Sequence, residues 1–335
     1  MKKLQVWGLL ACACIPASAQ ILINGAGATF PYPIYAKWFD EFHKINSKAQ
    51  FNYQSQGSGA GIRQLQQGTV DFGASDSPMT DQQIAKAGTR VIHFPTVLGA
   101  VVPTYNVAGV KQDLNFTPEA LAGIFLGKVN RWNDSELTRS NPGVALPAQG
   151  IVVVHRSDGS GTTFVWTDYL TKASAEWKQK VGSGNALKWP VGLGAKGNEG
   201  VAGIVKQTPN SIGYVELVYA IQNKMPYGRV RNSAGSFVKA ELKTVTAAAA
   251  AAAASMPDDF RVSITNPPGK DAYPISSFTW LLVPARIQDA QKRKMITDFL
   301  RWMLNGGQKM AEPLGYAPLP KAVIAKELKA ISQVQ

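Results

Sequence analysis

The chain has 335 residues, 45% of them hydrophobic, and a formal net charge of +13. This is enough apolar material for one or two domains with substantial cores. The charge suggests nucleic-acid binding, but the basic residues are scattered, cluster only at Lys292-Arg293-Lys294 and form no nucleic-acid motif. Three histidines and two cysteines also argue against a metal centre. We therefore interpret the charge as a basic, solvated surface.

Residues 1–19 have the pattern of a signal peptide. Met1-Lys2-Lys3 is basic, the stretch from Leu4 to about Ile15 is apolar, and Ala17-Ser18-Ala19 is an A-x-A-like cleavage site. The apolar run is too short to span a membrane, and no later run is long enough. We therefore expect an exported protein whose mature chain starts at Gln20.

Both cysteines, Cys12 and Cys14, fall inside this leader. The mature protein would then have no disulfide, which fits a periplasmic protein of this size better than a small disulfide scaffold. Leu9-Leu10-Ala11-Cys12 weakly resembles a lipoprotein box, so a form anchored to lipid at Cys12 is the alternative.

Hydrophobic spacing predicts strands that alternate with helices along the chain. In order, they are a helix over 35–45, a strand at 51–53, a helix from 62 that Gly68 ends, a buried strand at 70–74, and a long strand over 94–105 that crosses between two lobes. The second half adds a buried strand at 151–154, a helix over 164–170, a strand at 278–283, and an amphipathic helix over 296–304 that Gly306-Gly307 closes. Such alternation is typical of an α/β fold with mostly parallel sheets, in which ligands lie beyond the carboxyl ends of strands.

Three loops rich in Gly, Ser or Thr each run into a helix-like pattern. They are residues 25–31, 56–61 and 156–162. A helix N-terminus leaves its first N–H groups unpaired and carries the positive end of the helix dipole. Small residues let an anion approach those groups, and Ser or Thr hydroxyls add further donors. Three such loops, one of them with an arginine, predict donors that converge on a small oxyanion.

Arg156 stands between a strand of apolar residues and the third loop, so we expect it to be at least partly buried. A buried arginine without an anionic partner is costly. Asp158 could hold one edge of the guanidinium while the other edge faces a ligand. The alternative is a plain ion pair between Arg156 and Asp158 that only shapes the loop. The neighbouring Ser160-Gly161-Thr162 favours the ligand-binding interpretation over this alternative.

Asp76 lies just beyond the predicted strand at 70–74. Its carboxylate would repel an anion unless that anion carries a proton to donate. Inorganic phosphate does so near neutral pH, since the second ionisation of phosphate groups lies at about pH 6 to 7, whereas sulfate does not. One acceptor among many donors would thus admit phosphate and reject sulfate, by about 10⁴-fold or more. Alternatively, Asp76 caps a turn at Ser77-Pro78.

Several motifs, in order over nearly the whole mature chain, resemble the phosphate-binding proteins of bacterial phosphate-specific ABC uptake. They are residues 25–31, the Gly57-Ser58 loop, and residues 71–76, 156–164, 189–194, 212–216 and 317–320. The resemblance implies a two-lobed periplasmic binding protein fold of type II, with mostly parallel sheets flanked by helices and the ligand in the cleft between the lobes. It places 20–98 and 270–335 in lobe 1 and 99–269 in lobe 2.

The resemblance also implies a set of phosphate-binding residues. Lobe 1 would supply Thr29, Phe30, Ser58 and Asp76, and lobe 2 would supply Arg156, Ser160, Gly161 and Thr162, with Asp158 supporting Arg156. Phe30 and Gly161 would act through their backbone N–H groups. The protein would bind one phosphate without a metal or cofactor, hand it to a membrane permease with a cytoplasmic ATPase, and act as a monomer.

Two positions depart from the family pattern. Gly59 stands where the family commonly has a second serine, so one hydroxyl donor is absent while the Gly59 N–H remains. His155 stands where another basic residue is often found, and strand alternation would point it away from Arg156. The alanine run Ala247–Ala254 is not a family hallmark; with high helix propensity and no polar face, we interpret it as part of a surface helix or a variable insertion.

Two other classes of function compete. A secreted phosphoester hydrolase or phosphatase would need a nucleophile such as Ser58 or Ser160 and a base among His43, His93 and His155. No G-x-S-x-G elbow and no Walker A lysine is present, so we do not expect an enzyme. A secreted or surface adhesion protein would use the basic exterior instead.

Overall fold

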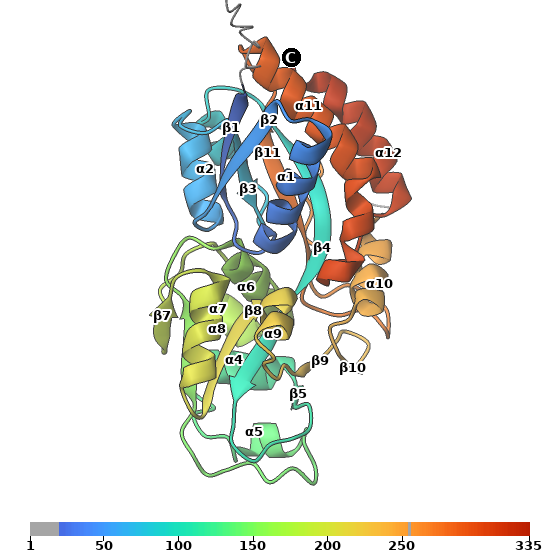
Figure 1. The fold of residues 1–335 in the computed structure, drawn as a ribbon. Coiled ribbons are helices and arrows are strands. Elements are labelled where there is room, and N and C mark those ends of the chain that lie inside the picture. Colours follow the sequence, from blue (N-terminus) through green and yellow to red (C-terminus); the bar gives the residue numbers. More distant parts are fainter. Residues whose placement is uncertain (1–19, 254–255) are drawn as a thin grey trace, which may run out of the picture.

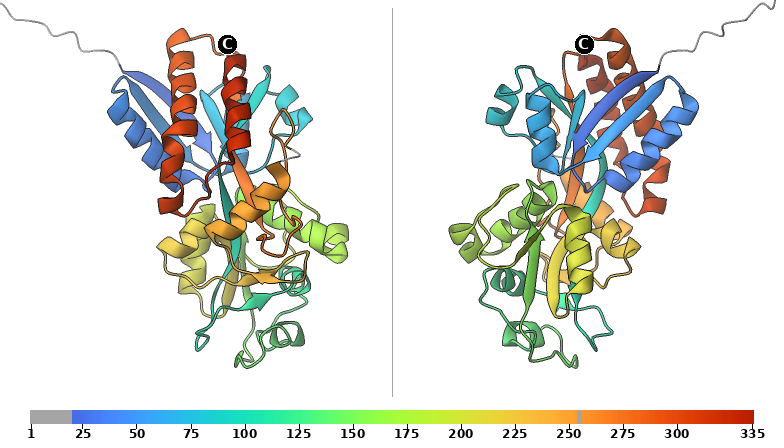
Figure 2. Two further views of the ribbon diagram at one scale, coloured as in Figure 1. Left: turned by 90° about the vertical axis from the view of Figure 1, so that its right-hand side faces the viewer. Right: turned by 60° about the vertical axis from the view of Figure 1, so that its left-hand side comes forward.

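The structure is a computed structural model that describes residues 20–253 and 256–335. The predicted signal peptide, Cys12 and Ala254 lie outside the described residues. Two lobes lie one above the other, and strand β4 (Val91–Asn106) runs through both (Figure 1). Figure 2 shows the C-terminal helices side by side on one face of the upper lobe. No helix in the described ranges combines the length and the apolar character that a membrane crossing requires.

The upper lobe is a sheet flanked by helices. Its strands are β1 (Ile21–Gly27), β2 (Ala49–Ser55), β3 (Phe72–Ser75) and β11 (Ser276–Pro284), and its helices are α1 (Tyr32–Ile45), α2 (Ser58–Gln66), α3 (Asp81–Ala85), α11 (Ala290–Asn305) and α12 (Lys321–Ala330). Short 3-10 helices cover Gly307–Met310, Glu312–Leu314 and Ile331–Gln333. Phe39 of α1 stacks on Phe51 of β2 with ring centroids 4.8 Å apart, and Phe299 of α11 packs against both rings. This aromatic core fixes α1, whose first turn follows the first predicted loop.

The lower lobe contains shorter strands and most of the remaining helices. Its strands are β5 (Asn115–Phe116), β6 (Val152–Arg156), β7 (Leu193–Ala195), β8 (Ser211–Glu216), β9 (Arg229–Arg231) and β10 (Phe237–Val238). Its helices are α4 (Pro118–Phe125), α5 (Ser135–Thr138), α6 (Gly161–Ala173), α7 (Ala175–Lys180), α8 (Gly197–Gln207) and α9 (Leu217–Gln222). Trp166 of α6 stacks on Tyr214 of β8 with ring centroids 5.1 Å apart, which holds α6 against the sheet below the third loop.

One eight-stranded sheet runs through both lobes in the order β2-β1-β3-β11-β4-β8-β6-β7. Neighbouring strands are parallel toward its two ends and antiparallel around β11 and β4, so the sheet is mixed. Strand β4 pairs with β11 up to Ala100 and with β8 from Val101 onward. The predicted strand that crosses between the lobes is therefore confirmed.

The other predicted helices and strands are present, with differences at their ends. β3 begins at Phe72 instead of Val70, because Asp71 accepts the Asn24 N–H and pairs with Lys292. Gly306 follows the last residue of α11 but keeps right-handed helical angles, since a 3-10 helix continues directly from it.

The described part of the alanine run belongs to a helix at the surface, as predicted, with Ala250 and Ala251 exposed and another face buried. Helix α10 (Leu242–Ala253) contacts β4 and β11, and Ala248 and Ala249 are fully buried. Methyl side chains let this helix lie close to the sheet, which explains why a run without a polar face is tolerated here.

The lobe boundaries at 98/99 and 269/270 stay a prediction. The first falls inside the continuous strand β4. Before the predicted boundary at 269/270, the chain already contacts the upper lobe. Phe260 O accepts a hydrogen bond from Trp280 Nε1 at 3.0 Å, and Arg261 donates to Met79 O at 3.0 Å. The connection between the lobes is thus spread over more than one segment.

Glu327 in α12 gives a prediction about stability. In the described part of the chain it is fully buried and neither carboxyl oxygen has a hydrogen-bond partner, and this burial raises the pKa of Glu327 well above its ordinary value. The folded protein therefore keeps a proton on Glu327 that the unfolded chain releases. The contribution of Glu327 to the free energy of unfolding is thus full at low pH and declines as pH rises. We expect the free energy of unfolding of the parent to decline above pH 5, by at most about 1.4 kcal/mol per pH unit for this one proton, and we expect Glu327→Gln to remove that decline.

Urea unfolding of the parent and of Glu327→Gln between pH 5 and pH 8 measures this decline. Glu312→Gln is the matched control, because Glu312 is exposed in the same lobe. Equal pH slopes for the parent and for Glu327→Gln would contradict the prediction.

Candidate functional site

The three predicted loops meet at the junction of the lobes. Two of them precede α1 and α2 in the upper lobe, and the third precedes α6 in the lower lobe. The predicted binding residues are all buried there: Thr29, Phe30, Ser58, Asp76, Arg156, Ser160, Gly161 and Thr162. The structure therefore brings together residues that lie far apart in the sequence, as the predicted site requires.

Ser58 and Gly161 join the two lobes directly. The Gly161 N–H donates to Ser58 Oγ at 3.1 Å, and the Asp76 N–H donates to the same oxygen at 3.2 Å. The expected role of the Gly161 N–H as a donor to the anion is therefore wrong in this structure. Because Ser58 Oγ accepts twice, its own proton is left to donate. A Cβ on residue 161 would lie 2.6 Å from Asp76 Oδ2, so only glycine fits at this approach.

The ion pair between Arg156 and Asp158 is present and bidentate. Arg156 Nε donates to Asp158 Oδ1 at 2.7 Å, and Nη2 donates to Oδ2 at 2.5 Å. Burial alone would raise the pKa of Asp158, but the hydrogen bonds and charge of Arg156 lower it overall. Asp158 Oδ1 also accepts the Gly197 N–H at 3.1 Å, which anchors the pair. One edge of the guanidinium is thus held, and Nη1 points to Thr162 Oγ1 at 3.3 Å.

Asp76 is 1% exposed, and its Oδ1 accepts a hydrogen bond from Thr279 Oγ1 at 2.8 Å. Burial raises the pKa of Asp76 to about 7, although the hydrogen bond from Thr279 and the charge of Arg156 act in the opposite direction. The alternative role as a cap of the turn at Ser77-Pro78 is wrong, because Ser75 Oγ accepts the Ser77 N–H at 3.1 Å.

Thr29 and Phe30 present backbone donors to the junction. In the part of the chain that the structure describes, no protein acceptor pairs with either N–H. The carbonyl groups of the same two residues are occupied: Tyr219 Oη donates to Thr29 O at 2.6 Å, and Tyr316 Oη donates to Phe30 O at 2.7 Å. These bonds orient the two peptide groups so that the loop before α1 keeps its N–H groups available for an anion.

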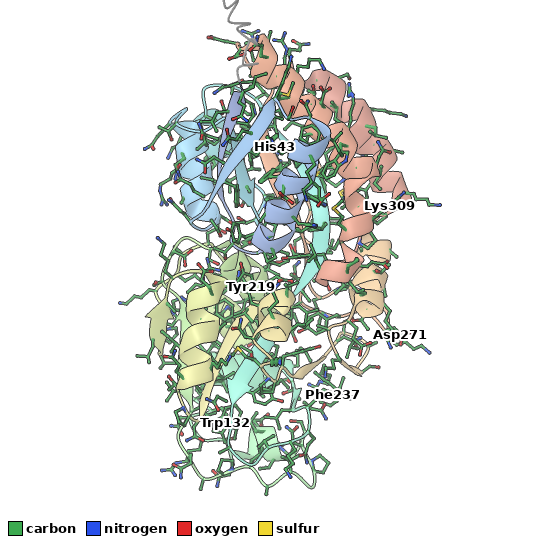
Figure 3. The ribbon with its side chains drawn as sticks, viewed as in Figure 1. His43, Trp132, Tyr219, Phe237, Asp271 and Lys309 are labelled. Atoms are coloured by element: carbon green, nitrogen blue, oxygen red, sulfur yellow. The ribbon has the colours of Figure 1, made fainter. Side chains whose placement is uncertain are left out.

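Sequence reasoning missed three residues that contact the predicted ones. Thr279 bonds to Asp76, Tyr219 bonds to Thr29 from the other lobe, and Asn198 bonds to both Thr29 and Thr162. Figure 3 places Tyr219 where the two lobes meet. Asn198 had a signal, because Gly194-Ala195-Lys196-Gly197 is one more small-residue loop that runs into a helix. Thr279 lies inside strand β11 and Tyr219 lies inside helix α9, and no local sequence pattern indicates a role for either residue.

The expected role of the Gly59 N–H as a remaining donor is wrong in this structure. It donates to Gly159 O at 2.8 Å, across the junction. A Cβ on residue 59 would lie 3.0 Å from the Gly159 Cα, so the two glycines let the loops approach closely. Gly59 therefore serves the contact between the lobes.

The three histidines have structural partners away from the predicted serines. His43 Nδ1 lies 2.8 Å from Ala49 O, in the upper lobe (Figure 3), and His93 Nε2 accepts the Met79 N–H at 3.0 Å. The His155 ring stacks on Trp189 with centroids 4.8 Å apart, so the prediction that it points away from the Arg156 side chain is confirmed. Within the described ranges, no His, Cys, Asp and Glu side chains gather into a group that could hold a metal ion.

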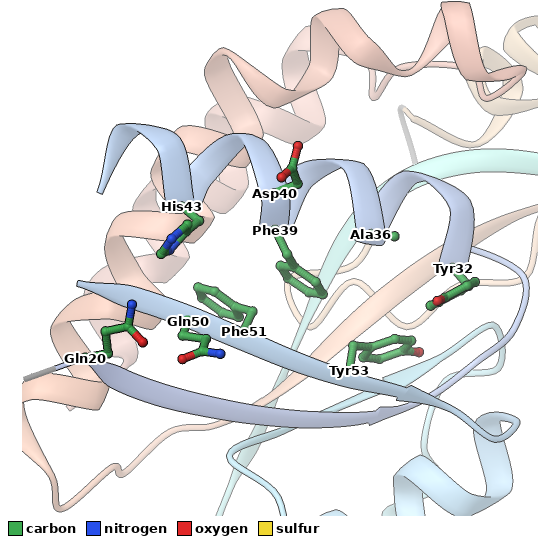
Figure 4. Close-up of a pocket in the computed structure, with 9 residues that line it drawn as sticks. All are labelled: Gln20, Tyr32, Ala36, Phe39, Asp40, His43, Gln50, Phe51 and Tyr53. Atoms are coloured by element: carbon green, nitrogen blue, oxygen red, sulfur yellow. The ribbon is translucent and has the colours of Figure 1, made fainter. Parts of the chain in front are cut away.

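A separate hollow lies in the upper lobe between α1 and β2 (Figure 4). Phe39, Phe51, Tyr53 and Tyr32 give it an aromatic lining, and His43 lies at one end. It contains none of the predicted binding residues, so we do not assign the anion site to it.

Comparisons with known proteins agree with this arrangement. The pattern of the PBP superfamily domain matches residues 15–306. Phosphate-binding protein PstS of Xylella fastidiosa (strain Temecula1) is 46% identical over 320 residues, which cover 94% of this chain and 87% of that protein. The protein of the same name from Pasteurella multocida is 44% identical and covers 91% of this chain and 88% of its own.

Among solved structures, the high affinity periplasmic phosphate-binding protein PfluDING, bound with phosphate, has a TM-score of 0.74 at 23% identity, covering 92% of this chain and 93% of that chain. This likeness confirms the two-lobed periplasmic binding protein fold that the sequence predicts. Since the superfamily pattern matches most of the chain and close relatives align over more than nine tenths of it, the protein belongs to the PBP superfamily and, within it, to the family of PstS phosphate-binding proteins.

Proposed function

We propose that this protein binds inorganic phosphate between its lobes and delivers it to a membrane-embedded ABC permease with a cytoplasmic ATPase. The observation that carries the proposal is Asp76, a buried carboxyl group placed among hydrogen-bond donors from both lobes. The relatives in the PstS family are named phosphate-binding proteins, which supports the same ligand.

The donors come from both lobes. From the upper lobe, Thr29 and Phe30 offer N–H groups and Ser58 offers its hydroxyl proton. From the lower lobe, Arg156 offers the edge of its guanidinium that Asp158 leaves open. Such donors stabilise a phosphate anion because they are fixed in place before it arrives and lie in a water-excluded site.

The N-terminus of α6 completes the lower half of the site. Ser160 caps the helix by accepting the Thr163 N–H at 3.0 Å, so its hydroxyl proton is free to donate. Gly161 and Thr162 form the first turn of α6. The Gly161 N–H is taken by Ser58, so the Thr162 N–H and the positive end of the helix dipole are the features of this turn that favour an anion.

Asp76 explains the proposed selectivity of the site for phosphate over sulfate. Ionised Asp76 is an acceptor, and hydrogen phosphate carries a proton that can bind it, whereas sulfate carries none near neutral pH. Sulfate would leave the buried carboxylate both unpaired and repelled. A site that requires a hydrogen bond discriminates against ligands that lack it by about 10⁴-fold.

Closure of the lobes accompanies binding. The junction is held by hydrogen bonds from Gly161 to Ser58, from Gly59 to Gly159, and from Tyr219 to Thr29. These bonds must break for phosphate to leave, so a permease that favours the open form would release the ligand.

We also propose an exported, monomeric protein that is periplasmic after cleavage behind Ala19, and not an enzyme. The relatives named here are binding proteins. A phosphatase would need a base beside Ser58 or Ser160, and each histidine has another partner. The adhesion alternative would require binding to an anionic surface that persists in excess phosphate.

Calorimetric titration of the mature protein with phosphate, then with sulfate, across pH 5 to 9 tests the proposed function. We expect tight phosphate binding, and sulfate binding at least about 1000-fold weaker near pH 8. A phosphomonoester assay on the same sample separates binding from hydrolysis. Equal affinity for the two anions, or turnover of the ester, would overturn the proposal.

A further inference from the structure

Asn198, the second residue of α8, is fully buried at the junction and uses its whole amide group within the protein. Its Oδ1 accepts the Glu216 N–H at 2.9 Å. Its Nδ2 donates to Thr29 Oγ1 at 2.8 Å and to Thr162 Oγ1 at 3.1 Å. A backbone N–H can only donate, so the bond from Glu216 fixes which end of the amide is the oxygen.

Both threonine hydroxyls are saturated as acceptors by these contacts. Thr29 Oγ1 also accepts the Asn198 backbone N–H at 3.3 Å, and Thr162 Oγ1 also accepts from Arg156 Nη1 at 3.3 Å. A hydroxyl has two acceptor lone pairs and one proton. Each oxygen therefore has both lone pairs engaged and only its proton left to bind a ligand.

We infer that Asn198 is a positioning residue that makes Thr29 and Thr162 donate, and only donate, to the bound anion. The inference rests on the proposed phosphate site. In the described part of the chain neither threonine hydroxyl donates to a protein acceptor, so both protons are free for the ligand. Asn198 itself has no polar atom left for phosphate, which separates its role from that of the binding residues.

The arrangement also links the orientation of the threonine hydroxyls to closure of the two lobes. Asn198 and Thr162 belong to the lower lobe, whereas Thr29 belongs to the upper lobe. The bond from Asn198 to Thr29 therefore forms only when the lobes meet, and only then is the Thr29 hydroxyl held as a donor. With both threonines fixed as donors, the proton that phosphate carries is directed to the carboxylate of Asp76.

A double-mutant cycle read by phosphate calorimetry tests this role. We expect Asn198→Ala to weaken phosphate binding by about 10-fold in the parent, because the hydroxyls become free to rotate and to accept. In the backgrounds Thr29→Val and Thr162→Val, one of the two hydroxyls is absent, so the same change is expected to cost about 3-fold. A residue that affected phosphate binding independently of these two hydroxyls would cost the same factor in every background.

Asn232→Ala is the matched control. Asn232 is also a buried asparagine of the lower lobe, and its amide donates to the carbonyls of Gly269, Lys270 and Ala272, outside the site. We expect it to lower thermal stability while phosphate affinity stays within about 2-fold. Equal costs of Asn198→Ala in all three backgrounds, or no cost in the parent, would overturn the role of Asn198 alone. Failure of the parent itself to bind phosphate would overturn the proposed function as well.

Discussion

Asp76→Asn is expected to reduce the selectivity for phosphate over sulfate by about 1000-fold, with a much smaller loss of phosphate affinity. The carboxamide has nearly the same shape, but its NH₂ group can donate to an oxygen of either anion. Sulfate is then no longer repelled, and Thr279 can still donate to the remaining carbonyl oxygen. Calorimetry with both anions at pH 8 measures the change.

Asp71→Asn is the matched control for this substitution. Asp71 is a half-buried carboxylate of the same lobe that pairs with Lys292 and accepts the Asn24 N–H, away from the binding residues. Its replacement should leave the ratio of the two affinities unchanged. If Asp76→Asn continued to exclude sulfate as the parent does, the acceptor role of Asp76 would have to be abandoned.

The same variant is expected to change the pH dependence of stability without ligand. Burial raises the pKa of Asp76 to about 7 in the folded protein, from its ordinary value of 3.8 when unfolded. Between these values the folded protein binds more protons, so the contribution of Asp76 to stability is full below pH 4 and is lost as pH rises to 7. Asp76→Asn should thus stabilise the phosphate-free protein at pH 8 by up to about 4 kcal/mol and have little effect near pH 4. Urea unfolding at both pH values provides the comparison.

Much of the candidate site could be predicted because its residues occupy recognisable local positions. Glycine and serine before an amphipathic stretch indicate a helix N-terminus, and α2 and α6 do begin at these loops, although Ser58 and Gly161 lie a few residues ahead of the predicted starts at 62 and 164. The apolar run before Arg156 predicted its burial, and Asp158 two residues later predicted its partner. In each case the physical cause lies within a few residues of the site.

The contacts that Thr279 and Asn198 make could not be predicted, because the order of the strands and the closure of the lobes create them. β11 lies beside β3 although about 200 residues separate them, and pairing of Trp280 with Ser75 sets Thr279 next to Asp76. Nothing near residue 279 in the sequence indicates this neighbour. Asn198 likewise meets Thr29 only because the two lobes meet.

The role of Gly59 was mistaken for the same reason. Its N–H stands at a helix N-terminus, which locally favours an anion, but the third loop approaches it from the other lobe and supplies Gly159 O as the acceptor. Local patterns indicate which groups can donate. Only the packing of the two lobes decides which donors remain for a ligand.

Arg156→Lys is expected to weaken phosphate binding by about 100-fold, which corresponds to about 2.7 kcal/mol. A guanidinium can bind Asp158 through two nitrogens and still present further N–H groups to a ligand, whereas an ammonium is a single point donor. Lysine at this position must either pair with Asp158 or turn to phosphate. Calorimetry of the variant beside the parent at pH 8 measures the loss.

Asp158→Asn gives an independent measure of the same arrangement, because it removes the charge that holds the guanidinium while Arg156 stays in place. We expect a loss smaller than that of Arg156→Lys, since the positive charge still faces the ligand and the amide oxygen can still accept one N–H. Arg231→Lys is the control, because Arg231 pairs with Glu119 on the surface of the lower lobe and should leave affinity within about 2-fold. If Arg156→Lys bound phosphate as tightly as the parent, the bidentate guanidinium would not be required for binding, and the proposed role of Arg156 in the site would have to be abandoned.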